Sequence, residues 1–153
     1  ELMPSTKNLV PASPWVELKV TQKDWDAADP ALLGDMLTQM HLIRAFEEKV
    51  LELAGQKLVN GPAHSSIGQE GGAVGSIVDL TGADQINGSH RGHHQFLAKA
   101  FGFVHPEGLD PRADFSADIR EVLQRSLAEI CGLAQGYCGG RGGSMHLQWK
   151  EAG

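Results

Sequence analysis

The sequence predicts the mostly helical front part of an α/β domain. Apolar residues recur every three or four positions in two long segments, 33–53 and 119–130, as expected for amphipathic helices. One short segment, 84–89, reads as a strand, and glycine-containing turns separate the elements. Because a single strand has no partner for its hydrogen bonds, the chain is expected to have too few strands to complete a sheet.

Residues 1–28 are expected to form an extended arm, and residues 29–153 to form the main domain. Three prolines prevent a regular helix in the arm: Pro4, Pro11 and Pro14. The arm also lacks the charged start and the apolar middle of a secretory signal peptide. We therefore expect the packed part of the molecule to begin near residue 29.

A long helix is predicted to begin at Pro30, because Asp29 before it is a good N-cap and proline fits the first helical position. Gly55 is its expected end. A second helix is expected from about Gly68 to Gly82, although it contains three more glycines: Gly71, Gly72 and Gly75. Each such glycine costs about 1 kcal/mol against alanine. We expect a neighbouring backbone to pack on this face, in an oligomer with two-fold symmetry.

Two further helices follow the predicted strand. The first covers 93–102, and Gly102 is its expected end. A polar, proline-containing loop, 103–118, leads to the second helix, where Asp118 and Glu121 have the spacing of a capping box. A glycine-rich loop completes the chain.

Composition excludes several classes of function. Of the 153 residues 41% are hydrophobic, which is enough for a core, and the net charge of −6 argues against a protein that coats nucleic acid. No apolar stretch is long enough to cross a bilayer, so no membrane partner is expected. Cys131 and Cys138 fit neither a zinc motif nor a disulfide framework, so we expect reduced thiols in a cytoplasmic protein.

Four nitrogen-rich side chains gather where the predicted strand meets the helix at 93: His90, Arg91, His93 and His94. A zinc site is one interpretation, but no cysteine or carboxylate nearby completes a ligand set. An anion site fits better, because a helix N-terminus offers free N–H groups and arginine matches a phosphate. A solvated, histidine-rich loop is the third interpretation.

Two other segments carry weaker signals. His64 follows a turn and could act as a base or hydrogen-bond donor in a cleft, or be an ordinary loop residue. Glu70 is explained by capping of the helix that it begins. The sequence GGRGGSMH, 139–146, has neither the ending of a Walker motif nor the spacing of a dinucleotide fingerprint. It could wrap a ligand or be a mobile linker.

The order of these motifs resembles a known family. MHLIRAFEEKVLELAGQ, HSSIGQEGGAVG, SHRGHHQFLAKA and GGRGGSMHL occur in the same order in the alpha part of the thiamine-diphosphate-dependent first component of 2-oxo acid dehydrogenase complexes. This family includes pyruvate, branched-chain 2-oxo acid and acetoin dehydrogenases. The resemblance covers roughly 33–147 and implies the N-terminal part of a transketolase-like, thiamine-diphosphate-binding parallel-sheet domain.

The resemblance implies a role for five residues. His90 and Arg91 match the pair that holds the cofactor diphosphate, in agreement with the anion interpretation, and Ser89 matches a neighbouring position that touches the cofactor in some members. His64 matches a catalytic histidine near the reacting carbon, and His93 is expected to line the same cleft. The reaction would be oxidative decarboxylation of a 2-oxo acid, with acyl transfer to lipoamide.

The sequence departs from the family pattern in three ways. The Gly-Asp-Gly motif whose residues hold magnesium is absent, so the metal ligands are expected outside this segment, and no residue here is assigned to metal. The glutamate that activates the cofactor belongs to the beta part. The link at 103–118 is longer than usual. We therefore expect the N-terminal piece of a larger protein, with the rest of the alpha part, a beta part and a lipoyl-bearing acyltransferase as partners.

Two alternative functions stay open at this stage. A related thiamine-diphosphate enzyme acting on a sugar or a hydroxyketone would have the same architecture. A non-catalytic assembly module would bind zinc through His90, His93 and His94.

Overall fold

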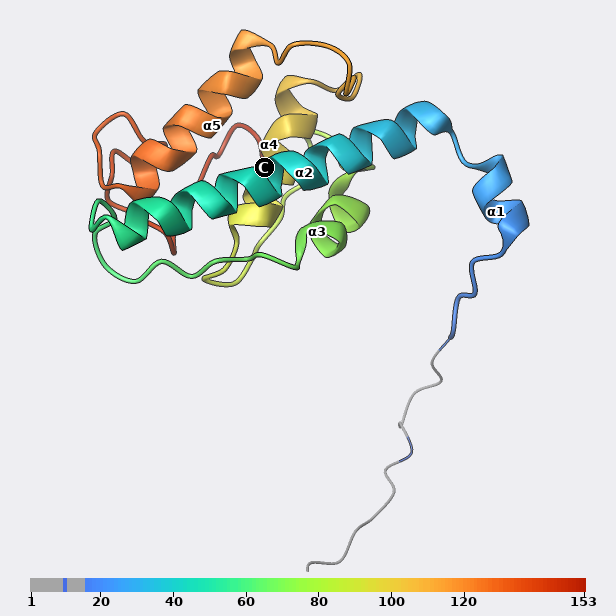
Figure 1. Cartoon of the computed structure of the whole chain (residues 1–153), viewed down its shortest axis with the longest axis horizontal. Helices are drawn as coiled ribbons and strands as arrows, with labels where there is room; N and C mark the ends of the chain where they lie inside the picture. The colour runs from blue at the N-terminus through green and yellow to red at the C-terminus, as the bar shows by residue number, and fades with distance from the viewer. Residues whose placement is uncertain (1–9, 11–15) are drawn as a thin grey trace, which may run out of the picture.

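The structure, a computed structural model, describes residue 10 and residues 16–153. Within this part of the chain there are five helices and no strand: α1 (Gln22–Ala27), α2 (Pro30–Gly55), α3 (Glu70–Ile77), α4 (His93–Val104) and α5 (Ala117–Ile130). Figure 1 shows α2 along the length of the molecule, with α3 and α5 on opposite sides of it and α4 behind. The mostly helical character is as predicted, whereas a parallel sheet is not seen in the described residues.

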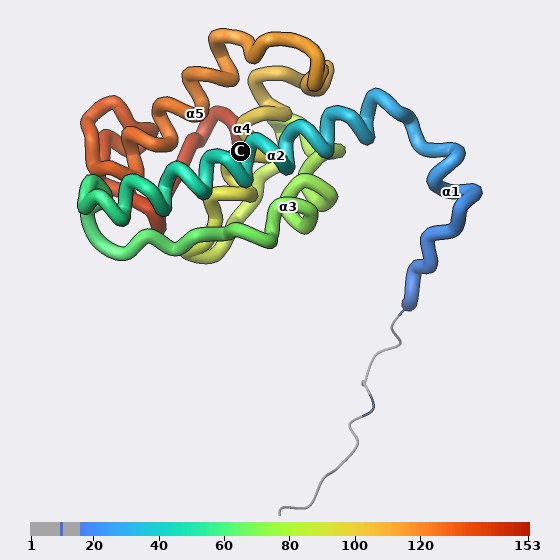
Figure 2. Tube along the Cα trace, in the orientation of Figure 1, coloured from blue at the N-terminus to red at the C-terminus, as the bar shows by residue number. Residues whose placement is uncertain are grey.

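The core lies where α2, α3, α4 and α5 meet. Ile43, Val74, Leu97 and Ile119 each come from a different one of these helices, and all four are fully buried. The segment after α5 turns back toward α4 (Figure 2), where Trp149 contacts the core. The loops that join these helices are therefore held at fixed positions around one core.

The arm differs from its predicted extended form. Gln22–Ala27 is helical because the amide and hydroxyl of Thr21 both donate to the Asp24 carboxylate, at 2.7 and 2.6 Å. None of the α1 side chains is buried, and α1 lies beyond the N-terminal end of α2 (Figure 1). The three arm prolines lie outside the described residues. The boundary between arm and main domain near residue 29 stays a prediction.

Helix α2 begins and ends where the sequence predicts. Asp29 Oδ1 accepts a hydrogen bond from the Ala31 amide at 2.9 Å, and Pro30 is the first helical residue. Gly55 is the last. The predicted cap and stop are therefore confirmed.

Helix α3 is shorter than predicted. Gly68 has a φ of +94°, which a helix does not allow, so α3 begins only at Glu70. It ends at Ile77, well before Gly82. A Cβ at Gly72 or Gly75 would meet no atom within 4 Å, so no backbone packs closely on that face in the described part of the chain. Coverage of this face by an oligomer stays a prediction.

Residues 84–89 are extended but do not form the predicted strand. A strand requires a ladder of hydrogen bonds to a second strand, and no described segment provides one. Helix α4 also differs from its prediction, because it continues through Gly102 to Val104. It ends before Pro106, which disfavours a helical conformation at His105.

Helix α5 begins two residues earlier than the predicted capping box indicates. Ser116 is its N-cap, and the Ser116 Oγ accepts a hydrogen bond from the Ile119 amide at 3.3 Å. Asp118 therefore lies inside the first turn. A loop precedes this helix as predicted, but it spans 105–116 and not 103–118. No helix in the described residues has the length and apolarity needed to cross a bilayer.

Candidate functional site

The exposed end of the histidine-rich segment lies against the loop that precedes α3. The His64 and His90 rings meet edge to face, with centroids 4.6 Å apart. Arg91 Nη1 donates to the Ser65 carbonyl oxygen at 2.7 Å, and the Arg91 amide donates to Ser89 Oγ at 3.2 Å. Ser89, His90 and Arg91 are all exposed. The structure thus brings together four of the five predicted site residues.

Unpaired donors at this point fit an anionic group. Gly92 is the N-cap of α4 and provides no side-chain cap, so the positive end of the helix is open. Arg91 forms no ion pair with any residue that the structure describes. The Nδ1 atom of His64 is buried and has no hydrogen-bond partner. A diphosphate group would supply acceptors for the Arg91 guanidinium and the free amides of the helix end.

His93 occupies a different environment from the one predicted. Only 1% of its surface is exposed, so it does not line a cleft. Its Nδ1 lies 2.7 Å from Glu47 Oε1. Its Nε2 lies 2.8 Å from the carbonyl oxygen of Ser144 and 2.9 Å from Ser144 Oγ. Both ring nitrogens therefore have partners inside the protein, and a role of His93 in catalysis stays a prediction.

Glu47 connects His93 to the loop that carries His64. It is fully buried, and its Oε2 accepts a hydrogen bond from the Ser66 amide at 3.0 Å. Burial opposes ionisation of Glu47, but the hydrogen bonds and charge of His93 and the Ser66 amide hold its pKa below the ordinary value. The His64 amide donates to Ser144 Oγ at 3.3 Å. A buried network therefore holds α2, α4 and two loops together under the exposed cluster.

His94 is also buried, which separates the four nitrogen-rich side chains into two pairs. Only 7% of His94 is exposed, and burial lowers its pKa. His90 and Arg91 are exposed, whereas His93 and His94 lie inside the molecule. No three side chains of His, Cys, Asp or Glu form a metal-ligating group among the described residues. The arrangement gives no support to a zinc-binding module.

The glycine-rich loop is organised by Glu129, a residue that the sequence analysis did not single out. This fully buried carboxylate accepts hydrogen bonds from four backbone amides, at 2.6 to 3.2 Å: those of Cys138, Gly140, Gly142 and Gly143. Burial opposes its ionisation, but these four amides hold its pKa below the ordinary value. The loop is therefore ordered around an internal anion and is not a mobile linker.

A sequence signal for both buried glutamates exists. Glu47 lies one helical turn from Ile43 and Val50, and Glu129 lies one turn from Ser126 and next to Ile130, so each occupies the buried stripe of its helix. A charged residue in such a stripe needs partners inside the protein. This pattern could have identified both residues.

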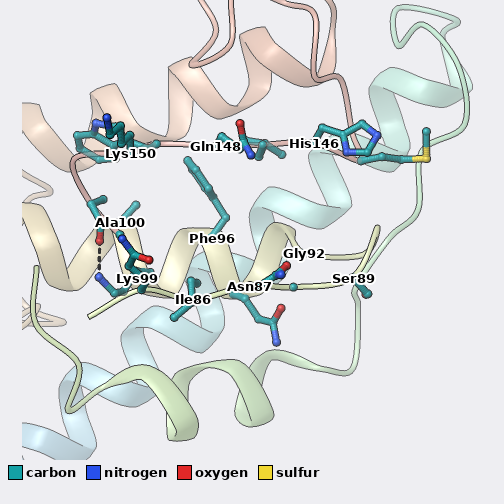
Figure 3. Close-up of a pocket in the computed structure, with 18 of the residues that line it drawn as sticks. Ile86, Asn87, Ser89, Gly92, Phe96, Lys99, Ala100, His146, Gln148 and Lys150 are labelled. Atoms are coloured by element: carbon teal, nitrogen blue, oxygen red, sulfur yellow. Dashed lines mark hydrogen bonds between the residues drawn. The ribbon is translucent and has the colours of Figure 1, made fainter. Parts of the chain in front are cut away.

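A cavity of about 740 Å³ lies next to the exposed cluster. The segment 85–89 and α4 line one side, and 144–150 line the other. Figure 3 shows Ser89 near one end and Lys99 at the other, where Lys99 Nζ donates to the Ala152 carbonyl oxygen. Ser89 is the one predicted site residue in its lining. His64, His90 and Arg91 lie outside it, so the cluster and the cavity are neighbouring features.

These features define a class of protein: a helical segment with an exposed His-Arg cluster at a helix N-terminus and a glycine-rich loop ordered by a buried carboxylate. Comparison of sequences identifies the class more closely. No family model matches the chain, and no solved structure matches it. The chain is 38% identical over 118 residues to the alpha subunit of acetoin:2,6-dichlorophenolindophenol oxidoreductase from Bacillus subtilis (strain 168). That alignment covers 77% of this chain and 29% of the relative.

Pyruvate dehydrogenase subunits are also similar. The E1 component subunit alpha of Zymomonas mobilis is 35% identical over 121 residues, which cover 78% of this chain and 28% of the relative. The somatic, mitochondrial form from Homo sapiens is 32% identical over 112 residues, which cover 73% of this chain and 24% of the relative. The chain thus spans less than a third of the length of these relatives.

Over the aligned segment the chain is homologous to the E1 alpha subunits of pyruvate and acetoin dehydrogenases. This confirms the resemblance that the order of the motifs indicates.

Proposed function

We propose that this chain supplies the diphosphate clamp of a thiamine-diphosphate-dependent 2-oxo acid dehydrogenase. The observation that carries the proposal is the exposed His90–Arg91 pair at the open N-terminus of α4, in a chain homologous to E1 alpha subunits. The proposed reaction is oxidative decarboxylation of a 2-oxo acid with acyl transfer to lipoamide. Thiamine diphosphate, when bound, supplies the chemistry that removes carbon dioxide from the substrate.

The residues of this chain bind and orient. Arg91 presents a planar set of N–H donors that matches a phosphoryl group, and its bond to the Ser65 carbonyl oxygen fixes the guanidinium. His90 and the Ser89 hydroxyl add donors beside it. His64, packed against His90, would hold or accept a proton during the reaction. His93 contacts no ligand and instead holds His64 through Ser144.

Further groups must come from other parts of the assembly. We propose that the rest of an alpha part, a beta part and a lipoyl-bearing acyltransferase complete the enzyme, and that ligands for magnesium lie outside this segment. We place the enzyme in the cytoplasm, where the two free thiols of Cys131 and Cys138 would stay reduced.

Acetoin, a hydroxyketone, is a second candidate substrate. Two relatives, at 38% and 33% identity, are alpha subunits of acetoin:2,6-dichlorophenolindophenol oxidoreductases. The clamp and the packed histidines would serve either substrate class, because they face the cofactor. Assays of the complete assembly with pyruvate, a branched-chain 2-oxo acid and acetoin distinguish the two candidates.

Arg91→Ala tests the clamp in the complete assembly. Loss of a charge-assisted contact should weaken thiamine diphosphate binding by about 1.5–3 kcal/mol, roughly 10- to 160-fold in Kd. Isothermal titration calorimetry measures the change. Arg120→Ala is the matched control, since Arg120 is exposed and its Nε contacts the Phe115 carbonyl oxygen. Unchanged affinity in Arg91→Ala would contradict the proposal.

A further inference from the structure

We infer that Glu129 is a positioning residue for the candidate site, because its carboxylate binds the backbone amides of the glycine-rich loop. Consecutive backbone N–H groups that converge on one point form a nest that binds anions. Here the nest spans 138–143, and its occupant is the Glu129 carboxylate at the end of α5.

The two carboxylate oxygens divide the loop amides between them. Oε2 accepts from Cys138 at 2.7 Å and from Gly140 at 2.9 Å. Oε1 accepts from Gly142 at 2.6 Å and from Gly143 at 3.2 Å. Because these four N–H groups point at Glu129, they cannot bind a phosphate from outside. The loop is thus a support, and its amides do not wrap an external ligand.

Glycine is needed where the backbone wraps most closely around this carboxylate. A Cβ at Gly136 would lie 2.5 Å from Glu129 Cα. Gly140 has a φ of +74°, and a Cβ there would lie 2.5 Å from the Gly132 carbonyl carbon. Side chains at these positions would push the loop off the carboxylate. Gly136 therefore allows the close approach to Glu129, and Gly140 allows the loop backbone to pack against Gly132.

Ser144 carries the effect of Glu129 to the site. It directly follows the nest, is buried, and contacts His93 Nε2 through both its carbonyl oxygen and its Oγ. Its Oγ also accepts from the His64 amide. Glu129 therefore fixes the loop, the loop fixes Ser144, and Ser144 fixes His64, which lies against His90. The effect of this chain of contacts on cofactor binding rests on the proposed function.

Hydrogen exchange of the complete, assembled protein tests the inference with Glu129→Gln. The amide side chain offers one acceptor oxygen and a donor group that faces the loop N–H groups. Backbone amides in 138–143 should exchange about tenfold faster or more, and so should amides in the distant segment 62–67. Glu121→Gln, an exposed change on the same helix, should alter neither segment. Unchanged exchange in 62–67 would overturn the inference, since a purely local role would not reach His64.

Chemical rescue gives a second readout. Glu129→Ala removes the carboxylate and leaves the four loop amides without a partner, so added acetate should restore slow exchange in 138–143. Chloride at the same ionic strength should not. Equal effects of the two salts would overturn the assignment of an anion nest. If this variant does not fold, Glu129→Gln alone decides.

Failure of the inference about Glu129 can be distinguished from failure of the proposed function. Arg91→Ala should leave exchange in 138–143 unchanged, because Arg91 contacts Ser65 and Ser89 and not the loop. An unchanged cofactor affinity in that variant would overturn the clamp alone. Unchanged hydrogen exchange in 62–67 of the Glu129→Gln variant would overturn only the positioning role of Glu129.

Discussion

The glycine-rich loop at 138–143 and the histidine-rich turn at 88–92 each place backbone N–H groups near a helix end. They differ in whether a carboxylate of the chain binds these groups. The loop closes around Glu129, whose carboxylate accepts four of its amides. The turn begins an uncapped helix and carries His90 and Arg91 without an internal anion. The loop amides thus bind a carboxylate of the chain itself, whereas no internal anion is bound at the turn in the described part of the chain.

This difference shows that a glycine-rich motif does not by itself mark a phosphate site. Which backbone N–H groups are free depends on buried partners that lie elsewhere in the sequence. Buried carboxylates stabilise both regions: Glu129 inside the loop, and Glu47 beneath the turn through His93. The experiments below test each side of the comparison, in order of decreasing effect.

Removal of Glu47 should cause the largest loss, because it supports the open turn from below. Glu47→Ala leaves His93 Nδ1 and the Ser66 amide buried without a partner. Breaking such a pair costs about 3–5 kcal/mol of the free energy of unfolding. Urea denaturation followed by circular dichroism measures the loss, with the exposed neighbour Glu48→Ala as control. Equal stability of the two variants would show that the network does not hold the turn.

A smaller and pH-dependent loss should follow Arg44→Gln. Arg44 donates to Glu70 at 2.6 Å, and with the Gly68 amide it lowers the pKa of Glu70 from 4.5 to about 2. A lowered folded pKa stabilises the protein above pH 4.5, and this stability is lost as the pH falls toward 2. The urea midpoint of the variant should therefore lie below that of the parent protein at pH 7. The difference between the two urea midpoints should be smaller at pH 3. An equal difference at both pH values would contradict the assignment of the lowered Glu70 pKa to Arg44.

The smallest effect should come from the arginine of the glycine-rich loop. Arg141 is exposed, and the amides around it bind Glu129. Arg141→Ala should change the Kd for thiamine diphosphate less than about threefold, because no phosphate contact is lost. Calorimetry under the conditions used for Arg91→Ala allows a direct comparison. A loss as large as that of Arg91→Ala would mean that the loop, too, contacts the diphosphate.

Local signals in the sequence predicted some features correctly. The cap at Asp29, the stop at Gly55 and the loop before α5 follow from the chemistry of single residues, and the structure confirms them. The motif order likewise identified the homologous subunits. Contacts between distant residues were missed, because spacing does not reveal them. His93 was expected in a cleft, but its partners Glu47 and Ser144 are 46 and 51 positions away.

Element ends were wrong where tertiary contacts or backbone conformation overrode propensity. Gly82 and Gly102 looked like helix ends, but α3 ended earlier and α4 continued to the residue before His105. The segment 84–89 has the composition of a strand, and a strand also needs a partner that these residues lack in the described part of the chain.

A structure of the complete assembly with thiamine diphosphate tests the central claim most directly. We predict that the diphosphate oxygens lie within hydrogen-bond distance of His90 and Arg91 at the N-terminus of α4, while the Glu129 carboxylate still accepts hydrogen bonds from the amides of 138–143. A diphosphate bound by the amides of the glycine-rich loop, with Arg91 directed into solvent, would contradict it.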